Sequence, residues 1–553
     1  MRPANMPNQN MPSHFDLVMA YHNQTKHHFE RYANGPEHID WEQQPSGFRY
    51  YEGAKQIELP LVADKINVQF DDLYTEPKNI FPLSLKNLSG LLELAFGLSA
   101  WKQFDDSRWP LRCNPSSGNL HPTEAYVITD DMDDLKVAVY HYVSEHHILE
   151  QRGIFADSQQ LQPILSSNHF LIGLSSIPWR EAWKYGERAF RYCQHDVGHA
   201  IAAVRYAAAC FGWKASVLPS WSDAEIAQLL GLNQTDDFHS NEIEIPETVL
   251  LIQTQQQANT CVCSGEHLAP VMQTIQWQGK ANLLDPKHHY EWPTIDKTIE
   301  ITKKPVTEEE KYLAPALPAL PPIADIQAAQ LIRQRRSAQQ FDGKSILGLD
   351  HFYRMLDCTL PREGSHFWDV FKSQPRLHLI FFVHRVDGLA NGLYILARHD
   401  AAVETLKQQL QHEKFTWQKP DSCPEHLAFY HLVSANAQNA AQRLSCHQNI
   451  ASHSAFSLGM LAEFEDHIQA ETWAYRRLFW EAGIIGQILY LEAEAAGMRG
   501  TGIGCFFDDA VHEVLGIKNH SLQSIYHFTV GMPVEDARLQ TIPPYAHLTE
   551  PRE

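Results

Sequence analysis

Two long stretches of the chain carry small and apolar residues at helical spacing. The positions are Val197, Ala200, Ile201, Val204 and Ala208 in the first stretch and Ile484, Ile488, Leu491 and Ala495 in the second. This spacing gathers the apolar side chains on one helical face, so each stretch is predicted to be a buried helix. Gly212 and Gly497 follow at the places where a helix C-terminal cap belongs.

The two stretches belong to an internal repeat. Residues 189–232 align without gaps onto residues 474–517. The matched residues are Arg191 with Arg476, Gly198 with Gly483, Gly212 with Gly497, Asp223 with Asp508 and Gly231 with Gly516. Because identities in one register rarely arise by chance, the chain is expected to hold two copies of one domain.

Apolar runs rich in β-branched and aromatic residues predict strands between the helical segments. Residues 125–128 and 377–383 are such runs, and they occupy equivalent places in the two copies. Each half is therefore expected to be an α+β domain. The length of 553 residues agrees with two domains, since it exceeds the size at which a single hydrophobic core usually stops growing.

A polar and then proline-rich stretch between Val271 and Ile323 predicts the domain boundary. Its prolines favour an extended, partly stiff connection. We accordingly divide the chain into an N-terminal extension (1–60), a first domain (61–275), a linker (276–325) and a second domain (326–545).

Charge and composition limit the classes of function. A formal net charge of -21 disfavours a general binder of nucleic acids or anionic membranes, because phosphate groups would repel such a field. Residues 1–15 lack an apolar core of signal-peptide length, and no apolar run approaches the length that spans a bilayer. The nine cysteines form an odd, irregularly spaced set, as expected for reduced thiols. A soluble, cytoplasmic protein is expected.

Two groups of potential metal ligands do not predict a metal site. Cys261 and Cys263 lie near His267, but no further residues nearby would complete a four-ligand set. A second group contains His22, His27 and His28 without an acidic or cysteine partner at suitable spacing.

Five short motifs carry candidate chemistry. They are Pro115-Ser-Ser-Gly-Asn119, Lys184-Tyr185, Arg335-Arg-Ser337, Gly502-Ile-Gly-Cys505 and, near the C-terminus, Arg538. Guanidinium groups and hydroxyls suit a phosphate, and glycines let a backbone approach a flat ligand closely. Taken singly, each motif also fits a turn, an exposed basic segment or a helix end. The prediction of a binding site therefore depends on their combination.

Together these motifs resemble the nitroreductase superfamily and, within it, the SagB-type dehydrogenases. The resemblance implies a symmetric dimer that binds FMN at its interface with motifs from both partners. In this chain the motifs lie in different halves of one sequence. The resemblance thus implies two tandem FMN-binding domains that form an intramolecular pseudo-dimer.

The resemblance also implies a role for each motif. The FMN phosphate and ribityl chain are expected to contact Arg335, Arg336 and Ser337, and the phosphate also Arg538. The flavin ring is expected to face Gly502, Ile503, Gly504 and Cys505, and to be capped from the other half by Pro115, Ser116, Ser117, Gly118 and Asn119. Gln339 stands where the family often has a second basic residue near the flavin pyrimidine, and its amide can still donate a hydrogen bond.

Lys184 and Tyr185 are the candidate catalytic residues, because they resemble the Lys-Tyr motif associated with azoline oxidation. A lysine removed from water beside a flavin could have a lowered pKa and act as a base. A tyrosine could instead relay the proton. The sequence leaves both assignments open.

A comparison of the two halves predicts one composite site. Opposite residues 502–505 the first half has residues 217–220, where Pro219 removes a backbone donor. Opposite residues 115–119 the second half has residues 368–372, which lack the Pro-Ser-Ser-Gly-Asn sequence that would cap a flavin. The Lys-Tyr pair likewise has no equivalent in the second half, so the mate of the site is expected to be lost.

The resemblance implies an FMN-dependent oxidoreductase that transfers hydride to or from flavin N5. Its expected substrates are azoline-like modified peptides or other small molecules, with O2 or NAD(P)H as the second reactant. One alternative is an NAD(P)H-dependent nitroreductase or quinone reductase. Another is a non-catalytic flavin-binding scaffold, against which the intact Lys184 and Tyr185 argue. No nucleic-acid or membrane partner is expected, and oligomerisation beyond the pseudo-dimer stays open.

Overall fold

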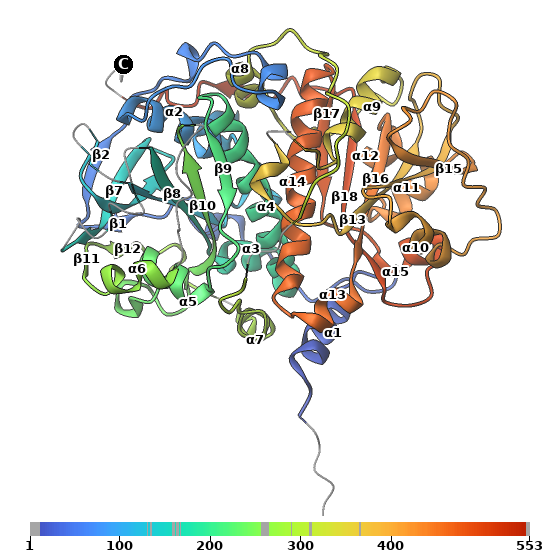
Figure 1. The fold of residues 1–553 in the computed structure, drawn as a ribbon. Coiled ribbons are helices and arrows are strands. Elements are labelled where there is room, and N and C mark those ends of the chain that lie inside the picture. The colour runs from blue at the N-terminus through green and yellow to red at the C-terminus, as the bar shows by residue number, and fades with distance from the viewer. Residues whose placement is uncertain are drawn as a thin grey trace, which may run out of the picture.

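The computed structural model describes residues 11–548 apart from several short gaps. The gaps are residue 130, residues 133–134, 157–160, 162–164 and 166–167, residues 256–264, residue 289, and residues 309–311 and 364–366. The chain folds into two α+β halves that lie side by side, coloured blue to green and yellow to red in Figure 1. The predicted α+β class with two tandem domains is confirmed.

Each half is built on one antiparallel sheet. The first sheet has the order β11 (Ile275–Trp277), β7 (Ile148–Phe155), β6 (Ala138–Val143), β5 (Thr123–Thr129), β8 (His169–Ser176), β10 (Ile245–Gln253), β9 (Lys214–Val217), with β2 (Lys55–Glu58) also pairing with β7. The second has the order β15 (Ala428–Ser434), β14 (Gly392–Ala397), β13 (Leu377–Val383), β16 (Phe456–Glu463), β18 (Leu522–Gly531), β17 (Arg499–Ile503). The strands from β9 to β7 in the first sheet correspond, one by one and in the same order, to the strands from β17 to β15 in the second sheet. The repeat therefore extends over whole domains.

Helices of both halves cover these sheets and meet between them (Figure 1). The helices of the first half and the connection are α1 (His14–Gln24), α2 (Leu85–Phe96), α3 (Pro178–Tyr185), α4 (Ala189–Ala209), α5 (Asp223–Leu230), α6 (Gly265–Met272) and α7 (Pro293–Ile301). The second half has α8 (Ala328–Gln334), α9 (Leu349–Cys358), α10 (Ala402–Gln409), α11 (Gln438–Leu444), α12 (Asn449–His453), α13 (Glu465–Ala470), α14 (Ala474–Ala495) and α15 (Asp508–Leu515).

The two predicted buried helices are α4 and α14, and they pack against each other at the centre of the molecule (Figure 1). They touch at two glycines that the repeat aligns. A Cβ atom added at Gly198 would lie 2.2 Å from the Trp480 carbonyl oxygen, and one at Gly483 would lie 2.2 Å from the His195 carbonyl oxygen. Only glycine allows this approach of the two backbones.

Ion pairs between the halves are reciprocal. Arg191 of the first half pairs with Asp508 of the second at 2.9 Å, and Arg476 of the second pairs with Asp223 of the first at 2.5 Å. The repeat aligns the two arginines with each other and the two aspartates with each other, so each ion pair is the counterpart of the other. This is the contact pattern of a twofold-symmetric interface.

Both ends of the chain reach across the halves. After α1, Lys26 forms an ion pair with Asp509 at 2.7 Å, and His27 forms an isolated parallel β-bridge with Phe507. Near the C-terminus, β19 (Gln540–Ile542) pairs with β3 (Leu98–Phe104), which in turn pairs with β4 (Ser107–Arg112). The tail of the second half thus adds a strand to β3 of the first half, on the side opposite to β4.

The predicted linker begins too early along the chain. Within residues 276–325 the structure has part of β11, the strand β12 (Lys280–Ala281), which pairs with β1 (Tyr51–Glu52), and α7, which packs against α1 and α4. Edge strands gain hydrogen bonds when another segment adds to them, and such pairing depends on tertiary proximity. After α7, the described residues 303–308 and 312–325 of this region belong to no helix or strand, so the extended connection is shorter than predicted.

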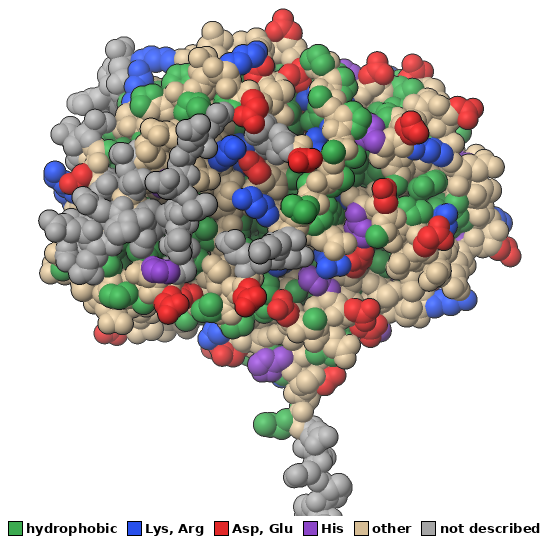
Figure 2. All heavy atoms as spheres, in the orientation of Figure 1, with side chains coloured by type: hydrophobic (Ala, Val, Ile, Leu, Met, Phe, Trp, Pro, Cys, Tyr) green, Lys and Arg blue, Asp and Glu red, His purple; other side chains and the backbone are tan. Residues whose placement is uncertain are grey.

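On the face drawn in Figure 2, acidic and basic side chains are interspersed. Within the described residues, no helix combines the length and the apolar character that crossing a bilayer requires.

Candidate functional site

A cavity of about 440 Å³ lies between the two halves. The first half contributes β4, the loop that follows it, and residues of α3 and α4. The second half contributes the segment after α8, the strand β17 and residues 533–536. Four of the five predicted motifs therefore have residues that border one space.

The cap motif, residues 115–119, lines the cavity throughout. Its last three residues form a single 3-10 turn, in which Gly118 and Asn119 have φ values of 59° and 60°. The Asn119 amide donates to the Pro110 carbonyl oxygen at 2.9 Å, and the Ser116 hydroxyl accepts the His121 backbone N–H at 2.8 Å. These bonds hold the left-handed turn against the cavity.

Asp196 of α4 is hydrogen-bonded to the cap motif. Its buried carboxylate accepts the backbone N–H of Ser117 at 3.0 Å and the Ser117 hydroxyl at 3.0 Å. Burial raises the pKa of Asp196 to about 7, although hydrogen bonds from Ser116 and Ser117 act in the opposite direction. A carboxyl group that can gain or lose a proton near neutral pH therefore borders the cavity.

One end of the cavity is basic. Arg335 and Arg336 lie there with Lys102 and Arg499. Arg335 donates to the carbonyl oxygens of Cys113 and Arg112, at 3.2 and 3.1 Å, while its buried Nη1 has no partner among the described residues. A buried donor without a partner is costly, so this end is suited to an anionic acceptor.

Ser337 joins the basic end to the glycine-rich strand. Its hydroxyl lies 2.8 Å from that of Tyr490, which accepts the backbone N–H of Gly502 at 3.0 Å. Ser337 and Gln339 are exposed residues on the cavity wall. The two predicted motifs of the second half are thus linked through a tyrosine of α14.

Glycines 502 and 504 are required by the aromatic rings beneath them. A Cβ atom at Gly502 would lie 2.0 Å from the Tyr526 hydroxyl oxygen, and one at Gly504 would lie 2.2 Å from the Tyr192 ring. Ile503 and Cys505 also line the cavity. The wall is closely packed and has no side chain at these two positions, so its backbone can approach a planar ligand.

The predicted catalytic pair lies at the C-terminal end of α3. Tyr185 lines the cavity, and a Cβ atom at Gly118 would lie 2.5 Å from its hydroxyl oxygen. Lys184 is not among the described lining residues, because its Nζ lies between two rings, 5.0 Å from the Trp41 centroid and 5.3 Å from the Tyr185 centroid. Burial lowers the pKa of Lys184 and raises that of Tyr185.

The structure does not bring Arg538 to the cavity. Its side chain is 74% exposed and pairs with Asp536 at 2.6 Å, with its guanidinium over the Phe104 ring. The preceding residues 533–536 do line the cavity, so the tail passes the site before it turns outward. Arg499, which also lines the basic end, was not predicted from the sequence.

Several residues that border the cavity escaped the sequence prediction. They are Lys102, Tyr192, Asp196, His199, Tyr490, Arg499 and Tyr526. Most lie on α4 and α14, whose apolar spacing predicts a buried face and gives no sign of a binding site. One signal was available: Asp196 is an acid within an apolar helix, and the repeat aligns it with the acid Glu481.

Residues of the two halves also meet at the symmetry-related position. Arg205, the repeat equivalent of Tyr490, forms an ion pair with Asp369 at 2.7 Å. Asp369 belongs to residues 368–372, which replace the cap motif, and the Ser216 hydroxyl donates to its carbonyl oxygen at 3.5 Å. These contacts join the segments that are equivalent to those lining the cavity.

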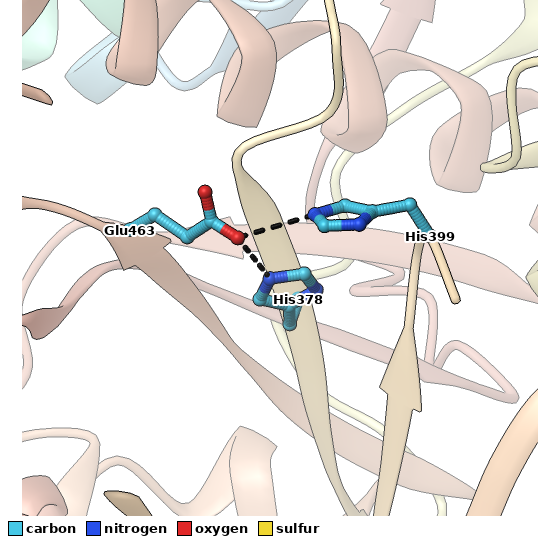
Figure 3. A group of neighbouring side chains, drawn as sticks. All are labelled: His378, His399 and Glu463. Carbon is cyan, nitrogen blue, oxygen red and sulfur yellow. Dashed lines mark hydrogen bonds and ion pairs between the residues drawn. The ribbon is translucent and has the colours of Figure 1, made fainter. Parts of the chain in front are cut away.

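A cluster of His378, His399 and Glu463 lies on the second sheet, away from the cavity (Figure 3). The His378 Nδ1 accepts the backbone N–H of Arg398 at 3.2 Å, so its Nε2 carries the proton and donates to Glu463 at 3.3 Å. A protonated Nε2 has no lone pair for a metal ion. The cluster joins three segments of the second half by hydrogen bonds. Cys261 and Cys263, the other potential ligands, lie outside the described residues.

Comparisons with known proteins agree with this fold. The protein named "Putative nitroreductase MJ1384" of Methanocaldococcus jannaschii is 25% identical over 190 residues, which are 32% of this chain and 91% of the relative. A crystal structure titled as a "putative nitroreductase" from Anabaena variabilis has a TM-score of 0.63 and 21% identity, covering 94% of this chain and 99% of the other. The sequence model of the Nitroreductase family matches residues 82–239 and 332–532, once in each half. The chain therefore belongs to the nitroreductase family.

Proposed function

We propose that the chain is an FMN-dependent oxidoreductase whose halves form an intramolecular pseudo-dimer with one flavin site. FMN is the cofactor of the nitroreductase family. The observation that carries the proposal is the buried Nη1 of Arg335 at the basic end of the interdomain cavity, which has no hydrogen-bond partner among the described residues. A phosphate oxygen would satisfy this donor.

The other lining residues fit the same cofactor. Arg336, Lys102 and Arg499 add positive charge near Arg335, and the volume lies within the range of small-molecule sites. The glycine-rich strand offers a flat wall for the ring, while the cap motif covers it from the first half. When bound, FMN supplies hydride chemistry at N5.

The chain's own residues would hold the cofactor and move a proton. Tyr185 is the candidate that borders the cavity, and Lys184 lies behind its ring. Asp196 positions the cap and offers a second titratable group. We assign Tyr185 as the proton-transfer group and Lys184 as the residue that adjusts its environment.

The finer proposal is a SagB-type dehydrogenase that oxidises azoline-like rings in modified peptides or small molecules. The Lys-Tyr motif and the cap motif support this branch. An NAD(P)H-dependent nitroreductase or quinone reductase is the alternative, since the glycine-rich wall would equally suit a stacked nicotinamide. Arg538, being exposed and paired with Asp536, is not proposed as a necessary ligand.

The test is the flavin content of the purified chain and of two variants. About one FMN per chain is expected for the wild type, with loss of FMN in Arg335→Ala. Arg333→Ala is the matched control, because Arg333 lies in the last turn of α8, two residues before Arg335, but pairs with the exposed Asp64. Two flavins per chain would contradict the single site, and none after reconstitution would contradict flavin binding.

The reaction direction can then be read from the bound flavin. If a synthetic thiazoline peptide bleaches the absorbance of the oxidised flavin under anaerobic conditions, the result would support the dehydrogenase. Bleaching by NADPH, without any response to the peptide, would support the reductase.

A further inference from the structure

Two cysteines from distant parts of the second half meet at the edge of the cavity. Cys505 follows the glycine-rich strand and lines the cavity, whereas Cys446 lies between α11 and α12. The segments that carry them are held together, because Phe507 donates its N–H to the Leu444 carbonyl oxygen at 2.8 Å, and the two thiols are neighbours. Gln448, which also lines the cavity, donates to the Cys505 carbonyl oxygen at 3.3 Å and ties the two segments together.

The turn that carries Cys446 is held in an uncommon conformation. Cys446 and His447 have φ values of 50° and 60°, in the left-handed region that non-glycine residues rarely occupy. Surrounding contacts maintain the turn, since Phe507 donates its N–H to the Leu444 carbonyl oxygen at 2.8 Å and its ring contacts that of His447. The position of the Cys446 thiol beside Cys505 is therefore imposed by the fold.

The environments of the two thiols differ. The hydrogen bond from Cys446 and the nearby Arg188 guanidinium lower the pKa of Cys505, against the effect of burial and of Asp508. The hydrogen bond with Cys505, together with burial, raises the pKa of Cys446. Arg188 is fixed there because it donates to the Gly504 carbonyl oxygen at 3.0 Å. One thiol is thus set to ionise before the other, as in dithiol redox pairs.

Other described cysteines lack this arrangement. Cys113, Cys193, Cys210 and Cys358 are buried. Cys423 is half-buried like the pair, but its Sγ faces the carbonyl oxygens of Pro424 and Leu427. Cys423 therefore offers a matched control.

We propose that Cys446 and Cys505 form a redox-active dithiol that exchanges electrons with the flavin of the cavity. In the oxidative direction, two S–H bonds break, one S–S bond forms, and two electrons and two protons pass to the oxidised flavin. In the reverse direction the disulfide takes two electrons and two protons from the reduced flavin. This exchange depends on the proposed function, whereas disulfide formation by itself does not.

The first test maps the disulfide. The purified full chain is treated with diamide, the remaining thiols are alkylated under denaturing conditions, and the peptides are identified by mass spectrometry. A peptide pair joined through Cys446 and Cys505 is expected in the wild type and in Cys423→Ser. It should be absent from Cys446→Ser and Cys505→Ser. Recovery of both cysteines as alkylated thiols after diamide would overturn the proposal.

The second test counts electrons. Anaerobic dithionite titration of the diamide-treated, FMN-loaded chain should consume four electrons per chain in the wild type and two in Cys446→Ser, because a disulfide accepts two beyond the flavin's two. Two electrons in both proteins would overturn the exchange with flavin. A chain that binds no FMN would instead contradict the proposed function, and the peptide map would still show whether the disulfide forms.

Discussion

The carboxylate of Asp196 accepts hydrogen bonds from both the backbone N–H and the hydroxyl of Ser117. It thereby ties α4 to the loop that covers the cavity. The repeat equivalent, Glu481, also accepts backbone N–H groups, those of Arg376 and Leu377. In that half, however, Arg398 pairs with the acid. The same helix position is hydrogen-bonded to residues 115–119 in one half and is paired with an arginine in the other.

Replacing Asp196 by Asn should weaken FMN binding. Above pH 7 the carboxyl group is ionised, because its pKa is about 7. At such a pH an amide keeps the size of the side chain but removes the negative charge from the bonds to Ser117, and hydrogen bonds to charged groups contribute about 1.5–3 kcal/mol. We expect a rise in the dissociation constant of about tenfold or more, measured by flavin fluorescence. Arg333→Ala serves as the control with unchanged affinity. Equal affinities of wild type and Asp196→Asn would refute the role of this contact.

Asp196 should also make stability depend on pH. Burial raises its pKa in the folded chain to about 7, whereas the ordinary value is 3.8. The folded state then holds the proton more tightly, so the contribution to stability is fully present below about pH 4 and is lost as the pH rises toward 7. The melting temperature of Asp196→Asn, relative to the wild type in saturating FMN, should therefore increase between pH 5 and 7.5. If the melting temperatures of the two proteins changed in the same way with pH, Asp196 would not ionise in this range.

Gly118→Ala should displace Tyr185. The added Cβ would lie 2.5 Å from the tyrosine hydroxyl oxygen, and the residue has a φ of 59°. Gly388→Ala is the matched control, because its φ of 70° imposes similar backbone strain while its nearest contact is 3.5 Å away. We expect kcat/KM to fall about 10- to 100-fold in Gly118→Ala alone, since small misplacements of reacting groups have effects of this size. Equal losses in both variants would indicate strain instead of displacement.

The two members of the Lys-Tyr motif should differ in their effects. Tyr185→Phe removes a hydroxyl that borders the cavity, and loss of a general acid or base typically slows turnover by about 10²- to 10⁴-fold. Lys184→Met should lower kcat less and shift the pH profile of the reaction, because Lys184 contacts the Tyr185 ring from outside the cavity. Steady-state kinetics across a pH series separate the two. A larger loss of kcat in Lys184→Met would reverse the assignment.

The reciprocal ion pairs should hold the halves together. Arg476→Met would leave the carboxylates of Asp223 and Glu247 without their buried partner, and breaking a buried pair costs about 3–5 kcal/mol. The melting temperature should fall by several degrees, and Arg476→Met combined with Asp223→Asn should recover part of that loss. Additive losses in the double variant would show that the pair is not coupled.

The sequence by itself determined the two-domain plan. Periodic apolar residues specify the helices α4 and α14, because burial of one helical face depends on local spacing. Identities in one register, such as Arg191 with Arg476, specify the duplication. Glycine-containing motifs such as residues 502–505 also identified part of the cavity wall, since the need for glycine is a backbone property.

Only the tertiary structure decided which side chains share the cavity. The bond between Ser117 and Asp196, the contact of Gly118 with Tyr185 and the approach of Cys446 to Cys505 each join residues from separate segments. Arg538 shows the reverse, since a residue predicted at the site turns outward to Asp536. The direction of a side chain depends on how whole elements pack, and local spacing along the chain carries no record of that packing.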